Sequence, residues 1–115
     1  MQKEILNTSS ALDMLSGEID LYKMLIDAFI SDSPSNLDTI DQLIAQGKNE
    51  EARAYSHKIK GSASQIGAEQ LTFALQYLED GLKGVMVAEV SALSRNASYV
   101  YNRTISYIKE YRQKL

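Results

Sequence analysis

The sequence predicts an all-α fold, an up-down-up-down antiparallel four-helix bundle with one or two short capping helices at the amino end. Apolar residues recur at helical spacings along most of the 115 residues, and glycines and polar residues separate these runs. No segment shows the sustained alternation that is typical of a strand. Short connections between helices favour antiparallel neighbours. A chain of 115 residues has the usual size of one compact domain, so we expect a single domain over residues 1–115.

The first half of the chain predicts three helices. Ser10 matches the start of a capping box, and the short helix that follows ends at Gly17. A second helix over residues 18–32 presents an apolar face made of Leu21, Met24, Leu25, Ala28 and Phe29. Ser33 and Pro34 predict a new helix start, because serine can cap a helix and proline fits the first helical position.

The second half of the chain predicts three more helices. Asn49 caps a helix that ends at about Gly67, and the next helix, over residues 68–82, carries a leucine stripe and ends at Gly81 and Gly84. The last helix, over residues 86–112, would be roughly 40 Å long at 1.5 Å per residue. One side of it carries Leu93, Ala97, Val100, Thr104, Tyr107 and Tyr111, which we interpret as packing positions.

The composition is that of an ordinary globular domain and excludes several functional classes. Hydrophobic residues make up 44% of the chain, the formal net charge is -3, and Lys and Arg are scattered, so nucleic acid is not expected as a partner. With no cysteine and one histidine, the chain is not expected to bind a metal ion or another cofactor of its own. No apolar run approaches the ~18 residues of a membrane span, so we expect a soluble, cytoplasmic protein.

His57 is the only histidine, and it lies on the helix predicted from Asn49 onward. At 100° per residue, the small and apolar positions of this helix fall on the opposite side: Ala52, Ser56, Ile59, Ala63 and Ile66. His57 therefore points away from the core, with Lys60, Gly61 and Ser64 on its own side. A neutral imidazole keeps a nitrogen lone pair, so this side chain can act as a nucleophile at neutral pH.

Two of these neighbours suit a histidine that carries a phosphoryl group. Lys60 offers an ammonium charge for phosphate oxygens, and Gly61 leaves room one turn along. Glycine in a helix interior costs about 1 kcal/mol relative to alanine, so it requires a reason. The structural alternatives are that Lys60 is ordinary surface charge, that Gly61 permits close helix packing, and that His57 is a surface or hydrogen-bonded residue. Gly61 faces the same way as His57, which weakens the packing alternative.

The motif Ser-His-x-x-Lys-Gly-Ser-Ala-x-x-Ile-Gly-Ala begins at Ser56, after two amphipathic helices and before the leucine-striped helix. In this arrangement the whole chain resembles the histidine-containing phosphotransfer (HPt) domain of bacterial-type two-component phosphorelays. The core signature of that family is matched at His57, Lys60, Gly61, Ser62, Gly67 and Ala68. The resemblance implies that the phosphoacceptor helix covers about residues 49–66.

The resemblance implies a phosphorelay intermediate and not an enzyme. His57 would accept a phosphoryl group from the aspartyl phosphate of one receiver domain and pass it reversibly to another receiver aspartate. In the resemblance, the receiver would supply the acidic pocket and Mg²⁺, and this chain would supply the nucleophile. Phosphoryl transfer depends chiefly on positioning and charge neutralisation, so a sparse site suffices. The implied partners are response-regulator receiver domains and a hybrid sensor kinase, and we expect a free-standing monomer.

In this family Nε2 of the histidine attacks, and a polar side chain of the following helix commonly holds Nδ1. Thr72, Gln76, Glu79 and Lys83 form a polar row on that helix, and either Glu79 or Gln76 could accept the Nδ1 hydrogen. We favour Glu79, although many relatives have glutamine at this place. The alternative is that the row is a solvated charged face.

Two other functions fit parts of the sequence. The first is a helical docking module that binds a receiver or kinase without carrying phosphate. The second is an enzyme that uses His57 as a general base, but the sequence lacks the paired acid, nucleophile or oxyanion donors for this chemistry. Whether or not His57 carries phosphate, we expect the docking interface to include the surface around His57. It should also include an apolar residue of the first short helix, Leu12 or Leu15.

Overall fold

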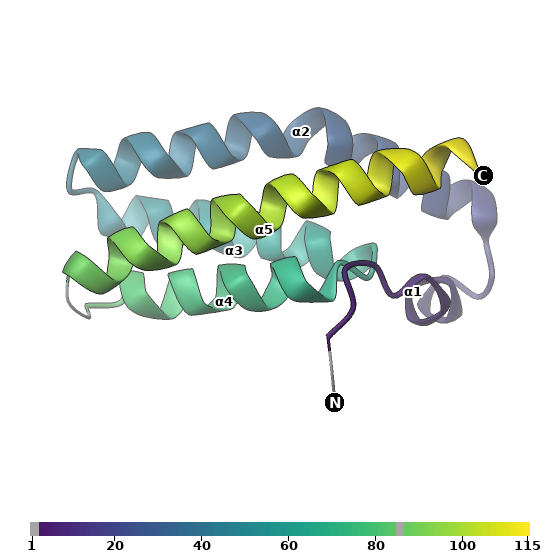
Figure 1. Ribbon diagram of the computed structural model, residues 1–115, viewed down its shortest axis with the longest axis horizontal. Helices are drawn as coiled ribbons and strands as arrows, with labels where there is room; N and C mark the ends of the chain where they lie inside the picture. Colours follow the sequence, from purple (N-terminus) through teal and green to yellow (C-terminus); the bar gives the residue numbers. More distant parts are fainter. Residues whose placement is uncertain (1–2, 85–86) are drawn as a thin grey trace.

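The computed structural model describes residues 3–84 and 87–115, and every regular element within these ranges is a helix. In chain order the helices are α1 (Thr8–Met14), α2 (Ile19–Ala45), α3 (Asn49–Gln65), α4 (Glu69–Leu82) and α5 (Val87–Gln113). The all-α prediction is therefore confirmed. In Figure 1, α2 to α5 extend along the long axis of the molecule, and α1 lies at one end. None of the described helices combines the length and apolar content that a membrane span requires.

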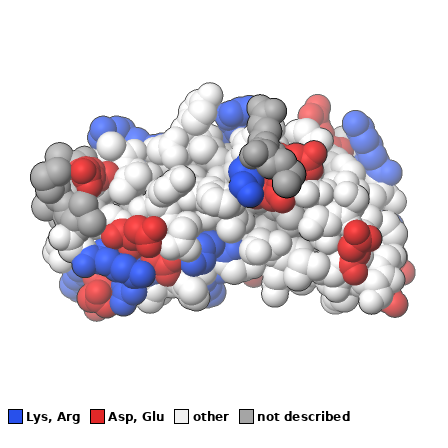
Figure 2. All heavy atoms as spheres, turned by 90° about the horizontal axis from the view of Figure 1, so that it is seen from below, with Lys and Arg blue, Asp and Glu red and all other residues white. Residues whose placement is uncertain are grey.

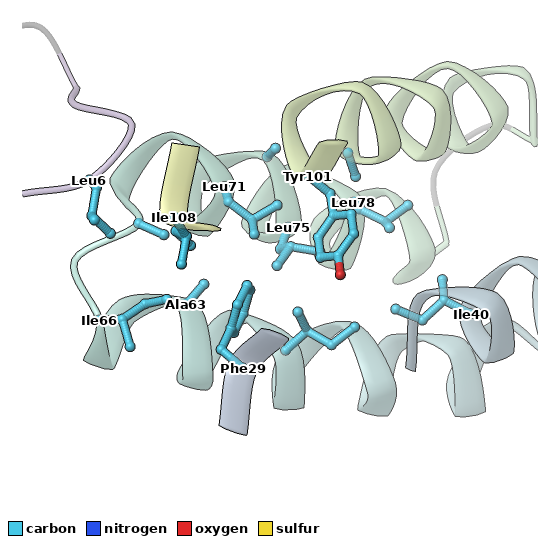
Figure 3. Packing of buried hydrophobic residues seen from close by; sticks show 14 of the residues in the cluster. Leu6, Phe29, Ile40, Ala63, Ile66, Leu71, Leu75, Leu78, Tyr101 and Ile108 are labelled. Atoms are coloured by element: carbon cyan, nitrogen blue, oxygen red, sulfur yellow. The ribbon is translucent and has the colours of Figure 1, made fainter. Parts of the chain in front are cut away.

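The four long helices pack around a shared core. α3 contacts α2 on one side and α4 on the other, and α5 packs against both α4 and α2. Buried side chains from all four helices point toward one another in Figure 3, among them Phe29, Ala63, Leu75 and Ile108. The molecule measures 41 × 30 × 21 Å, and a helix of 27 residues spans about 40 Å, so α2 and α5 each run its full length.

The predicted helix boundary at Ser33 and Pro34 is wrong, because both residues lie inside α2. The buried hydroxyl of Ser33 donates to the carbonyl of Phe29 and lies 2.8 Å from the hydroxyl of Tyr101 on α5. Pro34 is exposed, and its lack of an N–H group removes one hydrogen bond from the helix. The buried face continues from Phe29 to Ile40, so packing on α3 and α5 overrides the local start signal.

The apolar face predicted for the start of α2 is also partly wrong. Met24 is 67% exposed and Leu21 is 40% exposed, whereas Tyr22, Ile26 and Phe29 are buried. Two apolar stripes overlap on this helix, offset by one residue, and local periodicity does not choose between them. Tyr22 can be buried because its hydroxyl donates to the carbonyl of Ile66 at 2.8 Å, so its polar atom keeps a partner.

The stripe predicted for α5 is mostly correct. Ala97 and Thr104 are buried, and the ring of Tyr111 packs edge-on against Tyr22 with the ring centroids 6.3 Å apart. Tyr107 is 44% exposed, so its assignment as a packing residue is wrong. The predicted start of this helix at Met86 lies outside the described residues.

The chain segment before α1 crosses the turn between α3 and α4. Asn7, and not Ser10 as predicted, caps α1, because its side chain accepts a hydrogen bond from the Ser10 amide. The Asn7 amide donates to the carbonyl of Gly67 at 2.7 Å. Gly67 has a φ of 82°, and a Cβ at this position would collide with the carbonyl of Asn7. The backbone conformation and the close approach of Asn7 therefore explain why a glycine occupies this position of the motif.

Smaller differences concern the ends of α3 and α4. α3 begins at Asn49, so the capping position is Lys48, one residue earlier than predicted, and it makes no side-chain capping bond. Gly81 lies inside α4 and not beyond its end. A Cβ on Gly81 would lie 2.6 Å from a methyl carbon of Leu93, so this glycine permits α4 and α5 to approach closely.

Candidate functional site

His57 lies on the outward face of α3, and its side chain is 69% exposed. The residues that anchor this part of α3 are buried: Ser56, Ile59 and Ala63. The Ser56 hydroxyl donates to the Leu75 carbonyl of α4 at 3.1 Å, which fixes the rotation of α3 about its axis. Because His57 is the next residue along the helix, it is turned outward at the edge that faces α4.

Glu79 of α4 holds one side of the His57 ring. Nδ1 of His57 lies 2.8 Å from Oε1 of Glu79, whose side chain is only 8% exposed. An ionised carboxylate can only accept hydrogen bonds, so this contact places the ring hydrogen on Nδ1. In the neutral ring the lone pair is then on Nε2, the nitrogen that is not bound to α4.

The pKa of Glu79 shows that this carboxyl is ionised at neutral pH despite its burial. Burial acts to raise the pKa, but hydrogen bonds from Lys60 and His57 outweigh it, and the net pKa lies below the ordinary glutamate value. The Lys60 ammonium donates to Oε2 at 2.8 Å, so both carboxylate oxygens have a partner. The buried negative charge is thereby compensated within the protein.

Lys60 also reaches a second residue of α4. Its ammonium donates to Oε1 of Gln76 at 2.6 Å, and the Gln76 amide donates to Asp80 at 2.9 Å. The structure therefore joins four of the predicted site residues, His57, Lys60, Gln76 and Glu79, which we call the His57 network. Of the two candidates for the histidine partner, Glu79 contacts the ring and Gln76 contacts Lys60.

Gly61 and Ser64, the other two predicted site residues, take no part in the His57 network. Gly61 is exposed, and a Cβ built there would meet no atom within 4 Å. Close helix packing therefore does not require this glycine. Ser64 is exposed two turns beyond His57, where it borders a shallow groove with Met14 of α1 and Phe73 of α4. No hydrogen bond within residues 3–84 and 87–115 joins it to the network.

An open cavity beside His57 is lined by two basic side chains that the motif does not include. Its walls are formed by Glu50, Arg53, Ala54, His57, Glu79 and Lys83. Arg53 precedes His57 by four residues on the same helix face, a spacing that would have identified it from the sequence. Figure 2 shows side chains of both charge signs close together at its left end, which is the end where α3 starts and α4 finishes in Figure 1.

The site has the chemistry of a displayed nucleophile. Within the described residues, no group of three or more His, Cys, Asp or Glu side chains is arranged to hold a metal ion. What the site presents to solvent is an imidazole that is held through Nδ1, with open space beside Gly61. Such an arrangement can donate a lone pair to an electrophile carried by a partner.

Comparison with known proteins agrees with this geometry. Residues 24–106 match the family model described as Hpt domain. The chain belongs to the Hpt domain family. A search of curated proteins finds no match for this Hpt domain. Membership supports a histidine phosphotransfer role in two-component phosphorelays, in which Hpt domains interact with receiver domains and kinases and are not classical enzymes.

A solved structure shows the same fold. The Hpt domain is similar to the crystal structure of histidine-containing phosphotransfer protein B (HptB) from Pseudomonas aeruginosa PAO1, with a TM-score of 0.86. The similarity covers 99% of each chain at 22% sequence identity. At this identity the likeness shows a shared fold, and the roles of individual residues have to be argued from the site itself.

Proposed function

We propose that His57 is the phosphoacceptor of a phosphorelay intermediate, which takes a phosphoryl group from one receiver aspartate and passes it reversibly to another. The observation that carries this proposal is the His57–Glu79 contact, in which a nearly buried carboxylate holds Nδ1 of an exposed ring. The contact leaves Nε2 as the nucleophilic atom. Residues 1–115 would act as one domain, with the long helices as an up-down-up-down antiparallel bundle.

The transfer is a displacement at phosphorus, in which His57 replaces the aspartate of the receiver. Nε2 of His57 attacks the phosphorus of the receiver's aspartyl phosphate, a bond between nitrogen and phosphorus forms, and the aspartate leaves as a carboxylate. Nδ1 keeps its proton, so the ring gains positive charge as the bond forms. The Glu79 carboxylate, 2.8 Å away, faces this charge and stabilises it. The receiver would supply Mg²⁺ for the phosphoryl oxygens.

Partner docking would use the exposed surface around His57. Leu12 of α1 and Leu15, which directly follows this helix, pack partly buried against the core, whereas Met14 of α1 is 77% exposed. Met14 therefore replaces Leu12 and Leu15 as the apolar contact that we propose for this helix. The partners would be response-regulator receiver domains and a hybrid sensor kinase, with the Hpt domain acting as a monomer.

The proposal is tested by incubating the protein with a receiver that carries a labelled aspartyl phosphate. We expect the label to move to the Hpt domain as an acid-labile, alkali-stable adduct, and we expect His57→Gln to abolish it. Lys109→Gln is the matched control, because Lys109 is exposed on α5 and takes no part in the His57 network. Stable binding of the receivers of the same organism without label transfer would contradict the proposal and support a docking module.

A further inference from the structure

The hydrogen bonds between α3 and α4 define how the two helices are aligned at the site. Lys60 bonds Gln76, while His57, three residues earlier on α3, bonds Glu79, three residues later on α4. The two helices therefore run in opposite directions here, and equal steps along them bring facing residues to the same level.

Continuing this alignment places Arg53 opposite Lys83. Arg53 lies four residues before His57 on α3, and Lys83 lies four residues after Glu79, just beyond the end of α4. Both side chains line the cavity that also contains His57 and Glu79. The ring of His57 thus has a cation from each helix on one side, about one turn away.

The direction of helical side chains favours this side of the ring. In an α-helix the bond from Cα to Cβ is tilted toward the amino end, so a side chain lies over the preceding turn. For His57 the preceding turn contains Arg53, whereas Gly61 lies on the following turn. A group attached to Nε2 therefore lies nearer to Arg53 than to Gly61.

Lys60, the cation of the motif, is already bound to two side chains of α4. Its side chain is 19% exposed, and its ammonium contacts both Glu79 and Gln76. To reach a phosphoryl group, Lys60 would have to leave a nearly buried carboxylate without its charge partner, which is strongly unfavourable. Its main contribution is therefore to keep Glu79 ionised in place beside His57.

Arg53 and Lys83 are bound far less tightly. Arg53 pairs at 3.0 Å with Glu50, whose side chain is 78% exposed, and Lys83 lies 3.9 Å from Asp80 with both side chains more than half exposed. Exposed pairs of this kind contribute little, so both cations can change partner readily. Within the described residues, Nε of Arg53 is buried without a hydrogen-bond acceptor.

We propose that Arg53 and Lys83 form an anion-binding pair that holds the phosphoryl group on Nε2 of His57. The guanidinium supplies parallel N–H donors and the ammonium supplies a point charge. By pairing with the phosphoryl oxygens, the two cations stabilise the phosphohistidine itself, so the pair lengthens the lifetime of the phosphohistidine. This inference rests on the proposed function and adds the residues that retain the phosphoryl group between transfers.

The test uses phosphoramidate, a small-molecule phosphoryl donor, to label His57 without any receiver. After removal of the donor, the loss of the phosphoryl group is followed by phosphorus NMR. We expect Arg53→Gln and Lys83→Gln each to shorten the half-life by about fivefold, and the double variant to shorten it further. Arg53→Lys should retain most of the wild-type half-life, and Lys58→Gln should leave it unchanged. Urea unfolding of each variant shows that the fold persists.

The outcomes separate this inference from the proposed function. Half-lives within twofold of wild type in both single variants and in the double variant would overturn the anion-binding pair, whatever the receivers do. A wild-type protein that is labelled by phosphoramidate but never by a receiver would overturn the proposed function, while the comparison of half-lives still decides the role of Arg53 and Lys83. If phosphoramidate does not label His57, a receiver that carries aspartyl phosphate supplies the label, and the same half-lives are compared after its removal. A His57 that neither donor labels would overturn both.

Discussion

Replacing Gly61 with alanine separates the two reasons for which a glycine can occur inside a helix: packing within the protein, or access for a partner. Gly61 lies in α3, and a Cβ at this position would meet no atom within 4 Å. Alanine should therefore gain the difference in helix propensity, about 1 kcal/mol, without any steric cost. For a domain of this size, that corresponds to a rise in melting temperature of about 4 °C.

Gly67→Ala is the contrasting variant. Its φ of 82° lies in the left-handed region, and a Cβ would collide with the carbonyl of Asn7. We expect a loss of about 2 kcal/mol or more in the free energy of unfolding, because the segment before α1 has to move. Urea unfolding of the two variants beside wild type measures both effects, and they should have opposite signs.

Gly61→Ala should also slow phosphotransfer from a receiver, although it stabilises the fold. The added methyl group lies one turn from His57 on the exposed face, where a receiver has to approach within bonding distance. Misplacement of reacting groups by about 1 Å can cost 10²-fold in rate, so we expect at least about a tenfold slower transfer. Labelling by phosphoramidate, which needs no docking, should change little. A stabilised variant with wild-type transfer would refute the access argument, and a destabilised variant would refute the open-space argument.

Two further variants test the electrostatics and the backbone. The pKa of Glu79 is lowered in the folded state, so its contribution to stability is present above the ordinary glutamate value of about 4.3 and is lost as the pH falls through the folded value. Glu79→Gln should cost about 1–3 kcal/mol at pH 7 and flatten the acid limb of stability against pH; an unchanged acid limb would contradict this. Pro34→Ala should raise the free energy of unfolding by about 1–3 kcal/mol, since alanine restores an N–H donor inside α2. A lower free energy of unfolding in urea would show that α2 needs its proline.

The sequence by itself determined the helical class and the exposure of His57. Both follow from local periodicity: Ser56, Ile59 and Ala63 recur on one side of α3, so the position next to Ser56 has to face outward. The same reasoning would have identified Arg53, one turn before His57. It gave the wrong result at the start of α2, where two overlapping apolar stripes made Leu21 and Met24 look like core positions.

Only the tertiary structure decided the contacts between helices. Pro34 looked like a helix start, but burial on both sides of it keeps α2 continuous. Gln76 and Glu79 were both candidates for the His57 ring, with Glu79 favoured, and the axial offset between α3 and α4 brings Glu79 to the ring and places Lys83 opposite Arg53. That offset depends on how side chains of two helices interdigitate, and the periodicity of either helix alone carries no information about it.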